Sequence, residues 1–379
     1  MSEFLDHLSA NDNDIYDLLI SGRPRLTESV LREFARDRGI FCSPDETRES
    51  LADYLSILPH GYHDVDAIVR RREPVHRREK TTYVRLGAEL SVEELRLAAD
   101  EYARAAGASE KVIHRPKAQG GFAVNVVYDE FNHARARLLQ RERHEAEIEF
   151  LVQGGQTVIR LPATDKAKRV ARMIKEGVER ERKAVIQEES IELTGLTTPG
   201  LRSRFFTRLI SSLPGFKLKN VMSLKVSSHR SEDSEEDEAL DLESAGDDDA
   251  STEMFAAVVH SMALSGHNLV QSQEYKDLTS RGFFITSISW RSEHASEPAD
   301  IIQFDAGFED RKQGVGFKYA VQGAFRAHKG THRKTITHIV DAEKAGLLAL
   351  LEGTAQMVLK ELLEEAREET ETSVAEGDQ

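Results

Sequence analysis

Residues of the kind that hold a catalytic metal stand close together between Asp300 and Lys318. Asp300 and Asp305 flank an expected strand, an acidic pair follows at 309–310, and Lys312 and Lys318 come next. A metal-dependent nuclease needs two carboxylates to hold Mg²⁺ and a lysine that positions water or steadies developing charge. This region therefore indicates one enzymatic alternative, a Mg²⁺-dependent nuclease.

The same residues resemble a PD-(D/E)xK-like nuclease core, because Asp310-Arg-Lys312 supplies a D-x-K fragment. The strand position that would carry E-x-K reads Gly316-Phe-Lys318 in this chain. His328 and His332 have i, i+4 spacing, but a glycine lies between them and no carboxylate is near in sequence. There is no P-loop, dinucleotide fingerprint or G-x-S-x-G elbow, and the single Cys42 excludes a Cys-based zinc site. We expect no metal and no cofactor outside the nuclease alternative.

The distribution of charge is more informative than its total of −15. Residues 231–253 contain 12 acids and no Lys or Arg, and residues 361–379 contain 8 acids and one Arg. Because these two segments carry −12 and −7 of the total, the rest of the chain carries +4. Segment 231–253 has too few apolar residues to offset the entropy of ordering it, so it is predicted to be a disordered acidic linker.

The basic part of the chain is concentrated in three segments. Residues 194–230 and 311–340 contain no acid, and residues 68–85 are rich in arginine. Such segments are typical of a polyanion-binding face, although they could instead pair with the chain's own acidic linker or with an acidic partner. The residues expected to contact phosphate are Arg70, Arg71, Arg72, Arg77, Arg78, Arg202, Arg204, Arg208, Lys217, Lys219, Lys225, Lys318, Arg326, Lys329, Arg333 and Lys334.

The N-terminal region is predicted to be helical. Thr27 can cap a first helix that ends at Gly39, and Ser43-Pro44-Asp45 is expected to start a second one. With Leu31 and Leu55 on the apolar faces, residues 26–58 resemble the SAP and HeH-type helix–loop–helix motifs that bind DNA. Those families place Gly and Lys before the second helix, where this chain is acidic, so a helical packing or partner-docking unit is the alternative.

The remainder reads as two modules of strands followed by a long helix. Ser91-Val-Glu-Glu94 is a capping box that opens a helix, and strands with period-two alternation follow. On the expected strand 315–325, Lys318 lies on the face opposite Phe317, and small neighbours there would leave room for a ligand backbone. Arg326 and Lys334 are expected beside it. Helices are also predicted at 254–264, 269–278 and from 341 to about 366, and a strand at 335–340.

The predicted fold is α+β, with an N-terminal helical unit followed by two modules of antiparallel strands packed on long helices. The expected boundaries are a helical unit at 1–65, a basic linker at 66–90, a first module at 91–187, a second module at 188–230 and 254–366, the acidic linker at 231–253, and an acidic tail at 367–379.

The leading functional prediction is a non-enzymatic nucleic-acid-associated protein that contacts phosphate and is tuned by its acidic linker. The alternative is an adaptor or assembly subunit that docks acidic or basic segments of partner proteins. No secretory signal or apolar run long enough to cross a membrane is visible, so the sequence predicts a cytoplasmic protein without a membrane partner.

Overall fold

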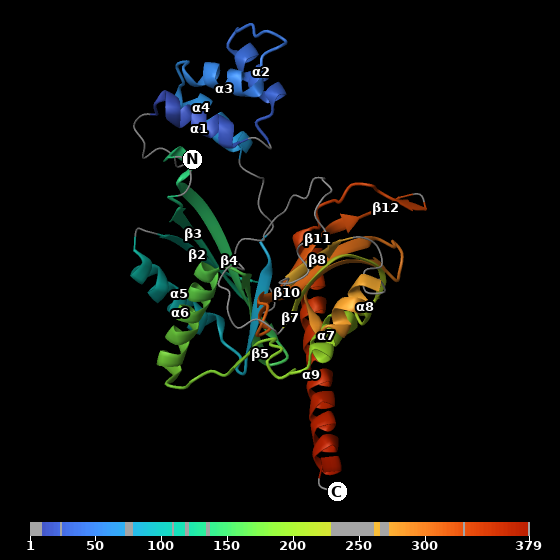
Figure 1. Ribbon diagram of the computed structural model, residues 1–379. Helices are drawn as coiled ribbons and strands as arrows, with labels where there is room; N and C mark the ends of the chain where they lie inside the picture. The colour runs from blue at the N-terminus through green and yellow to red at the C-terminus, as the bar shows by residue number, and fades with distance from the viewer. Residues whose placement is uncertain are drawn as a thin grey trace. The chain divides into compact units, whose positions relative to one another are not determined.

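The structure of the protein is a computed structural model with two compact units (Figure 1). Unit 1 contains residues 1–77, 90–150 and 165–184, and unit 2 contains residues 78–89, 151–164 and 185–379. Both units combine helices with antiparallel strands, so the predicted α+β class is confirmed. The structure describes residues 10–22, 25–72, 79–107, 110–117, 121–133, 137–228, 261–265, 273–328 and 330–377.

The N-terminal part of unit 1 is helical, as predicted. It consists of α1 (Asp12–Ser21), α2 (Glu28–Asp37), α3 (Arg48–Ser56) and α4 (Tyr62–Arg72), whose core includes the buried side chains of Leu18, Leu31 and Leu51. The second helix was expected to begin at Pro44 but begins at Arg48. There the Thr47 hydroxyl accepts a hydrogen bond from the Ser50 amide at 3.2 Å and caps α3.

The rest of unit 1 contains three antiparallel strands and two helices. The elements are α5 (Val92–Ala106), β2 (Glu110–Pro116), β3 (Phe122–Phe131), the 3₁₀ turn η3 (Arg137–Leu139), β4 (Arg141–Gln153) and α6 (Asp165–Arg182). The strand order is β2-β3-β4. Helices α5 and α6 pack closely where Gly177 faces Ala98, because a Cβ at Gly177 would lie 3.1 Å from the Ala98 Cβ.

The start of α5 carries the predicted capping box, and a cation from α6 strengthens it. The Ser91 hydroxyl accepts from the Glu94 amide, and the Glu94 carboxylate accepts from the Ser91 amide at 2.8 Å. Arg182 donates to the same carboxylate at 2.5 and 2.7 Å. These donors, with Arg182 first, lower the pKa of Glu94 to about 2.

We expect Glu94→Gln to lower the free energy of unfolding by about 1–2 kcal/mol at pH 7, because a cap and a partly exposed ion pair are lost. The pKa of Glu94 is lower in the folded chain than its unfolded value of 4.5, so the ionised carboxylate stabilises the fold at pH values above 4.5. This stabilisation is lost as the pH falls toward 2. The difference between wild type and variant should therefore shrink between pH 5 and pH 3 in urea titrations. A difference that does not depend on pH would contradict the assigned role of the carboxylate.

Unit 2 is built on a larger antiparallel sheet. Its order is β5-β1-β11-β10-β9-β7-β8, and β6 pairs with β1. The elements are β1 (Thr81–Leu86), β5 (Gln156–Pro162), β6 (Glu188–Glu189), α7 (Pro199–Ser211), β7 (Phe216–Ser228), β8 (Ser261–Ser265), α8 (Gln273–Ser280), β9 (Phe283–His294), β10 (Ile301–Asp310), β11 (Val315–Phe325), β12 (Ala327–His328), β13 (Thr331–His332) and α9 (Asp341–Gly377).

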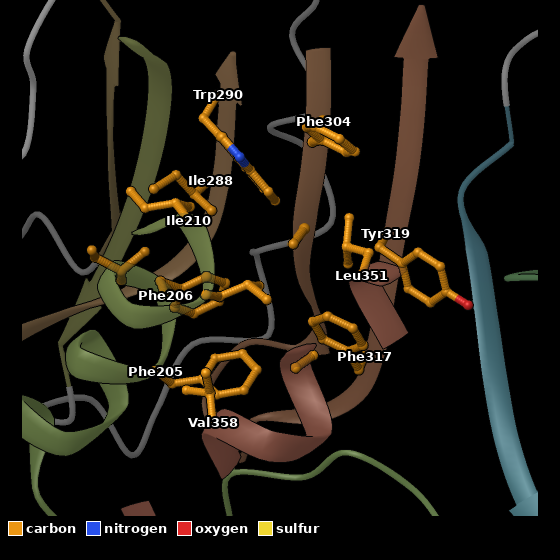
Figure 2. Packing of buried hydrophobic residues seen from close by; sticks show 14 of the residues in the cluster. Phe205, Phe206, Ile210, Ile288, Trp290, Phe304, Phe317, Tyr319, Leu351 and Val358 are labelled. Atoms are coloured by element: carbon orange, nitrogen blue, oxygen red, sulfur yellow. The ribbon is translucent and has the colours of Figure 1, made fainter. Parts of the chain in front are cut away.

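The main core of unit 2 lies on one face of this sheet, between the strands and the helices α7, α8 and α9. Figure 2 shows Phe205 and Phe206 of α7 and Leu351 and Val358 of α9 among the side chains that project from the strands. Trp290 stacks on a phenylalanine of β10, with ring centroids 5.4 Å apart. The described helices of unit 2 thus bury the apolar face of the sheet.

Three local predictions in unit 2 were wrong. Residues 261–265 form strand β8 instead of the end of a helix, because they pair with β7, whereas residues 254–260 lie outside the described part. Residues 335–340 form no strand, and Thr337 makes a single bridge to Ala324. Helix α9 continues to Gly377 instead of ending near residue 366. The start of the helix expected at 269–278 lies outside the described residues, and its described part is α8.

A buried ion pair crosses the core of unit 2. Arg160 of β5 donates two hydrogen bonds to Glu352 of α9, at 2.7 and 2.9 Å, and both residues are 4% exposed. The Tyr319 hydroxyl also donates to Glu352. Burial of Tyr319 is the main cause, and the nearby Glu352 carboxylate the second, that raises the pKa of Tyr319 well above its ordinary value.

In the described residues, no helix is both long and apolar enough to cross a membrane.

Candidate nucleic-acid interface

The sheet of unit 2 has a second face, opposite its main core, which we call the polar sheet face. Directly paired residues of antiparallel strands project to the same side, so the pairing register shows what this face carries. Lys318 pairs with Gly307, Gly307 with Ser287, and Ser287 with Lys225. These four residues form one row across β11, β10, β9 and β7. At about 4.8 Å per strand, the backbones of the two lysines lie about 14 Å apart.

The middle of this row is low because its residues are small and close to the backbone. A Cβ at Gly307 would lie 2.8 Å from the Ser287 Cβ, so no larger residue fits there without a shift. The Ser287 hydroxyl is turned toward the neighbouring strand and donates to the Ala306 carbonyl at 3.1 Å. The row is therefore a shallow strip of backbone with a lysine at each end.

The next two rows on the polar sheet face also combine small and polar residues. One contains Ala320, Asp305, Ser289 and Ser223 in register, and the Asp305 carboxylate accepts a hydrogen bond from Gln322. The other includes Arg291, which donates to Gln303 at 3.0 Å and lies 4.3 Å from the centre of the Phe325 ring. Across these three rows, three cations (Lys225, Lys318 and Arg291) stand against one carboxylate (Asp305).

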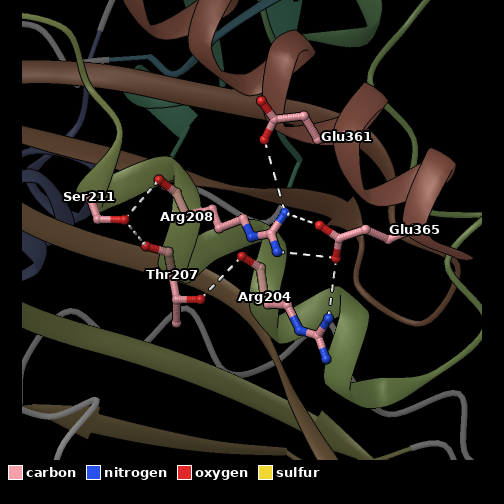
Figure 3. Close-up of polar contacts among 6 residues, drawn as sticks. All are labelled: Arg204, Thr207, Arg208, Ser211, Glu361 and Glu365. Carbon is pink, nitrogen blue, oxygen red and sulfur yellow. Dashed lines mark hydrogen bonds and ion pairs between the residues drawn. The ribbon is translucent and has the colours of Figure 1, made fainter.

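The cations expected on α7 are held elsewhere. Arg202 is 6% exposed and donates to the carbonyls of Leu196 at 2.9 Å and Lys312 at 2.5 Å. Figure 3 shows Arg204 and Arg208 reaching from α7 to Glu365 of α9, with Arg208 making contacts of 2.6 and 3.1 Å. In this structure all three arginines are used inside unit 2.

Several other expected cations also have acidic partners. Arg326 contacts Asp300 and Glu343, each at 2.7 Å, and Lys219 lies 3.3 Å from Glu293. Arg71 in unit 1 contacts Glu33 at 2.9 Å and lies over the Phe34 ring. Lys217, Arg333 and Lys334 are exposed. The side chains of Arg70 and Arg72, and all of Arg77, Arg78 and Lys329, lie outside the described residues.

The carboxylates considered for a nuclease have separate structural roles. Asp300 accepts from Arg326 and from the amide of Ala327, each at 2.7 Å, and Asp310 accepts from the Gln313 amide in the β10–β11 turn. Where the chain is described, no three His, Cys, Asp or Glu side chains are grouped to hold a metal ion. The structure therefore adds no support to the nuclease alternative.

The structure places Lys225 and Lys318, two of the sequence-predicted residues, at the two ends of one row, and the sequence gives no sign of this register. Sequence reasoning missed Gly307, Ser287 and Arg291. A period-two signal was available on β9, where Ser287, Ser289 and Arg291 alternate with buried apolar residues.

No protein-family model matches the chain, and no curated protein shows significant similarity to it. The resemblance of residues 26–58 to the SAP and HeH-type motifs stays a prediction from the sequence.

Proposed function

We propose that this protein is a non-enzymatic nucleic-acid-binding protein that contacts the phosphate backbone through the polar sheet face of unit 2. The observation that supports this function best is the row with Lys225 and Lys318 at its ends and Gly307 and Ser287 between them. A flat floor of small residues allows a ligand backbone to approach closely, and lysines supply the counter-charge that phosphate binding requires.

The chemistry of the face favours binding that depends little on base sequence. Phe325 is the aromatic residue beside the three rows. The Arg291 guanidinium covers one side of its ring, so a base cannot stack on that side. Base stacking on aromatic side chains is how many single-strand binders hold individual bases. We therefore expect contacts mainly to phosphate, with the acidic linker 231–253 competing for the same cations at high effective concentration.

Titration of labelled oligonucleotides at several salt concentrations tests the proposal. For the Lys225→Gln/Lys318→Gln variant, we expect weaker binding and a log–log salt slope that is less negative by about 1.4–1.8, because two phosphate contacts are lost. The matched control is Lys276→Gln/Lys360→Gln, which removes the same charge from exposed positions of α8 and α9 on the other side of the sheet. Equal salt slopes for the two variants would refute a role for the polar sheet face.

A second function, the docking of a partner protein, is favoured by the loop between α2 and α3. Phe41 is 100% exposed in this loop. Arg32 holds the loop in place by donating to the carbonyls of Ser43 at 2.7 Å, Pro44 at 3.0 Å and Glu46 at 2.8 Å. A large apolar side chain on a braced loop suits insertion into a partner's pocket. If no oligonucleotide binds at low salt, even after deletion of residues 231–253, this docking role becomes the better proposal.

A further inference from the structure

The basic face of α7 is occupied by carboxylates from the chain's own C-terminal helix. Arg204 and Arg208 lie one helical turn apart and converge on Glu365 of α9, as Figure 3 shows. Arg204 is 3.3 Å from Glu365, and Arg208 also approaches Glu361 at 4.0 Å. The arginines hold the pKa of Glu365 below its ordinary value, which keeps it an anion.

We infer that Arg204 and Arg208 form a second binding site for the phosphate backbone of a nucleic acid, and that the acidic end of α9 blocks this site. The inference rests on the proposed function and adds its regulation. Two guanidinium groups that converge on one carboxylate are also suited to a phosphate, since both ligands accept paired hydrogen bonds from arginine.

The blocking contacts are weak enough for a polyanion to displace. The side chains of Arg204, Arg208, Glu361 and Glu365 are between 32% and 50% exposed. Ion pairs that are this exposed contribute little individually and weaken with salt. A nucleic acid presents many phosphates at once, whereas α9 presents two carboxylates, so the competition depends on the local concentration of the attached helix.

Glu365 lies at the edge of the core, in a turn of α9 whose apolar residues Leu363 and Ala366 are only partly buried. Leu362 is fully buried, but the first three side chains after Ala366, those of Arg367, Glu368 and Glu369, are exposed. Segment 361–379 carries a net charge of −7, so a neighbouring polyanion repels the end of the helix. Rotation of the Glu361 and Glu365 side chains away from α7 would free both arginines while the core contacts of Leu362, Leu363 and Ala366 stay in place.

The test compares binding of a labelled oligothymidylate at low salt by full-length variants. Glu361→Gln/Glu365→Gln removes the blocking charges, and we expect affinity to rise about five- to tenfold, because two further phosphate contacts become available. The matched control, Glu364→Gln/Glu369→Gln, removes the same charge from exposed positions of α9 that do not contact Arg204 or Arg208. The control should change affinity much less.

Two further variants establish where the gain arises. Adding Arg204→Gln/Arg208→Gln to the unblocked variant should abolish the gain, whereas the same two changes in the wild type should alter affinity little. A gain no larger than that of the control overturns the inference, and continued dependence of binding on Lys225 and Lys318 would then leave the proposed function intact. If neither the wild type nor any variant binds, both proposals fail.

Discussion

Replacing Arg160 with methionine is expected to lower the free energy of unfolding by about 3–5 kcal/mol, because the substitution leaves Glu352 charged and buried without its partner. Arg160 and Glu352 are each 4% exposed, and their two hydrogen bonds join β5 to α9. Water cannot replace the guanidinium at such a depth, so the carboxylate bears the cost of desolvation without a charged partner.

Chemical denaturation of three proteins checks this expectation. The single variant Arg160→Met should show the full loss, and Arg160→Met/Glu352→Leu/Tyr319→Phe should recover most of it, since apolar replacement of a buried ionic cluster is often neutral or stabilising. Lys219→Met serves as the control, because it breaks an ion pair of the same unit in which both side chains are over a third exposed. A single variant as stable as this control would show that the buried pair is not required for the fold.

The second large effect is expected for Arg202→Gln, at about 2–4 kcal/mol of lost stability, because buried carbonyls lose charged hydrogen-bond donors. Arg202 donates to three carbonyls, those of Leu196, Lys312 and Gln313, and lies 5.1 Å from the centre of the Phe284 ring. It therefore fastens the start of α7 to the β10–β11 turn.

The matched comparison is Arg204→Gln on the same helix, whose arginine is 47% exposed. We expect the Arg204 variant to be nearly as stable as the wild type, and the Arg202 variant to bind oligonucleotide with an unchanged salt slope under conditions where it is folded. A reduced salt slope for Arg202→Gln would mean that the residue contacts phosphate after all.

The local elements were predictable because their signals are local. The capping box at Ser91 opens α5, and alternating apolar residues mark β9 and β11. The strand at 261–265 was missed because a short stretch of small and apolar residues suits a helix or a strand equally well, and its pairing with β7 decides between them.

The arginines of α7 show why the candidate site was harder to predict than the fold. Arg202, Arg204 and Arg208 lie in one acid-free stretch, which suggested a single basic surface. In the folded chain, the carbonyl of Lys312 and the carboxylate of Glu365 reach them from more than a hundred residues away. A count of charges along the sequence contains no information about such partners.

By itself, the sequence determined the α+β class, most helices and strands, and the division of charge between acidic segments and a mildly basic body. These properties follow from composition and from the periods of 3.6 and 2, which each segment carries within itself. The tertiary structure alone decided that Lys225 and Lys318 share a row and that Arg160 meets Glu352. Strand register and ion pairing depend on contacts between distant segments, and such contacts exist only once the chain has folded.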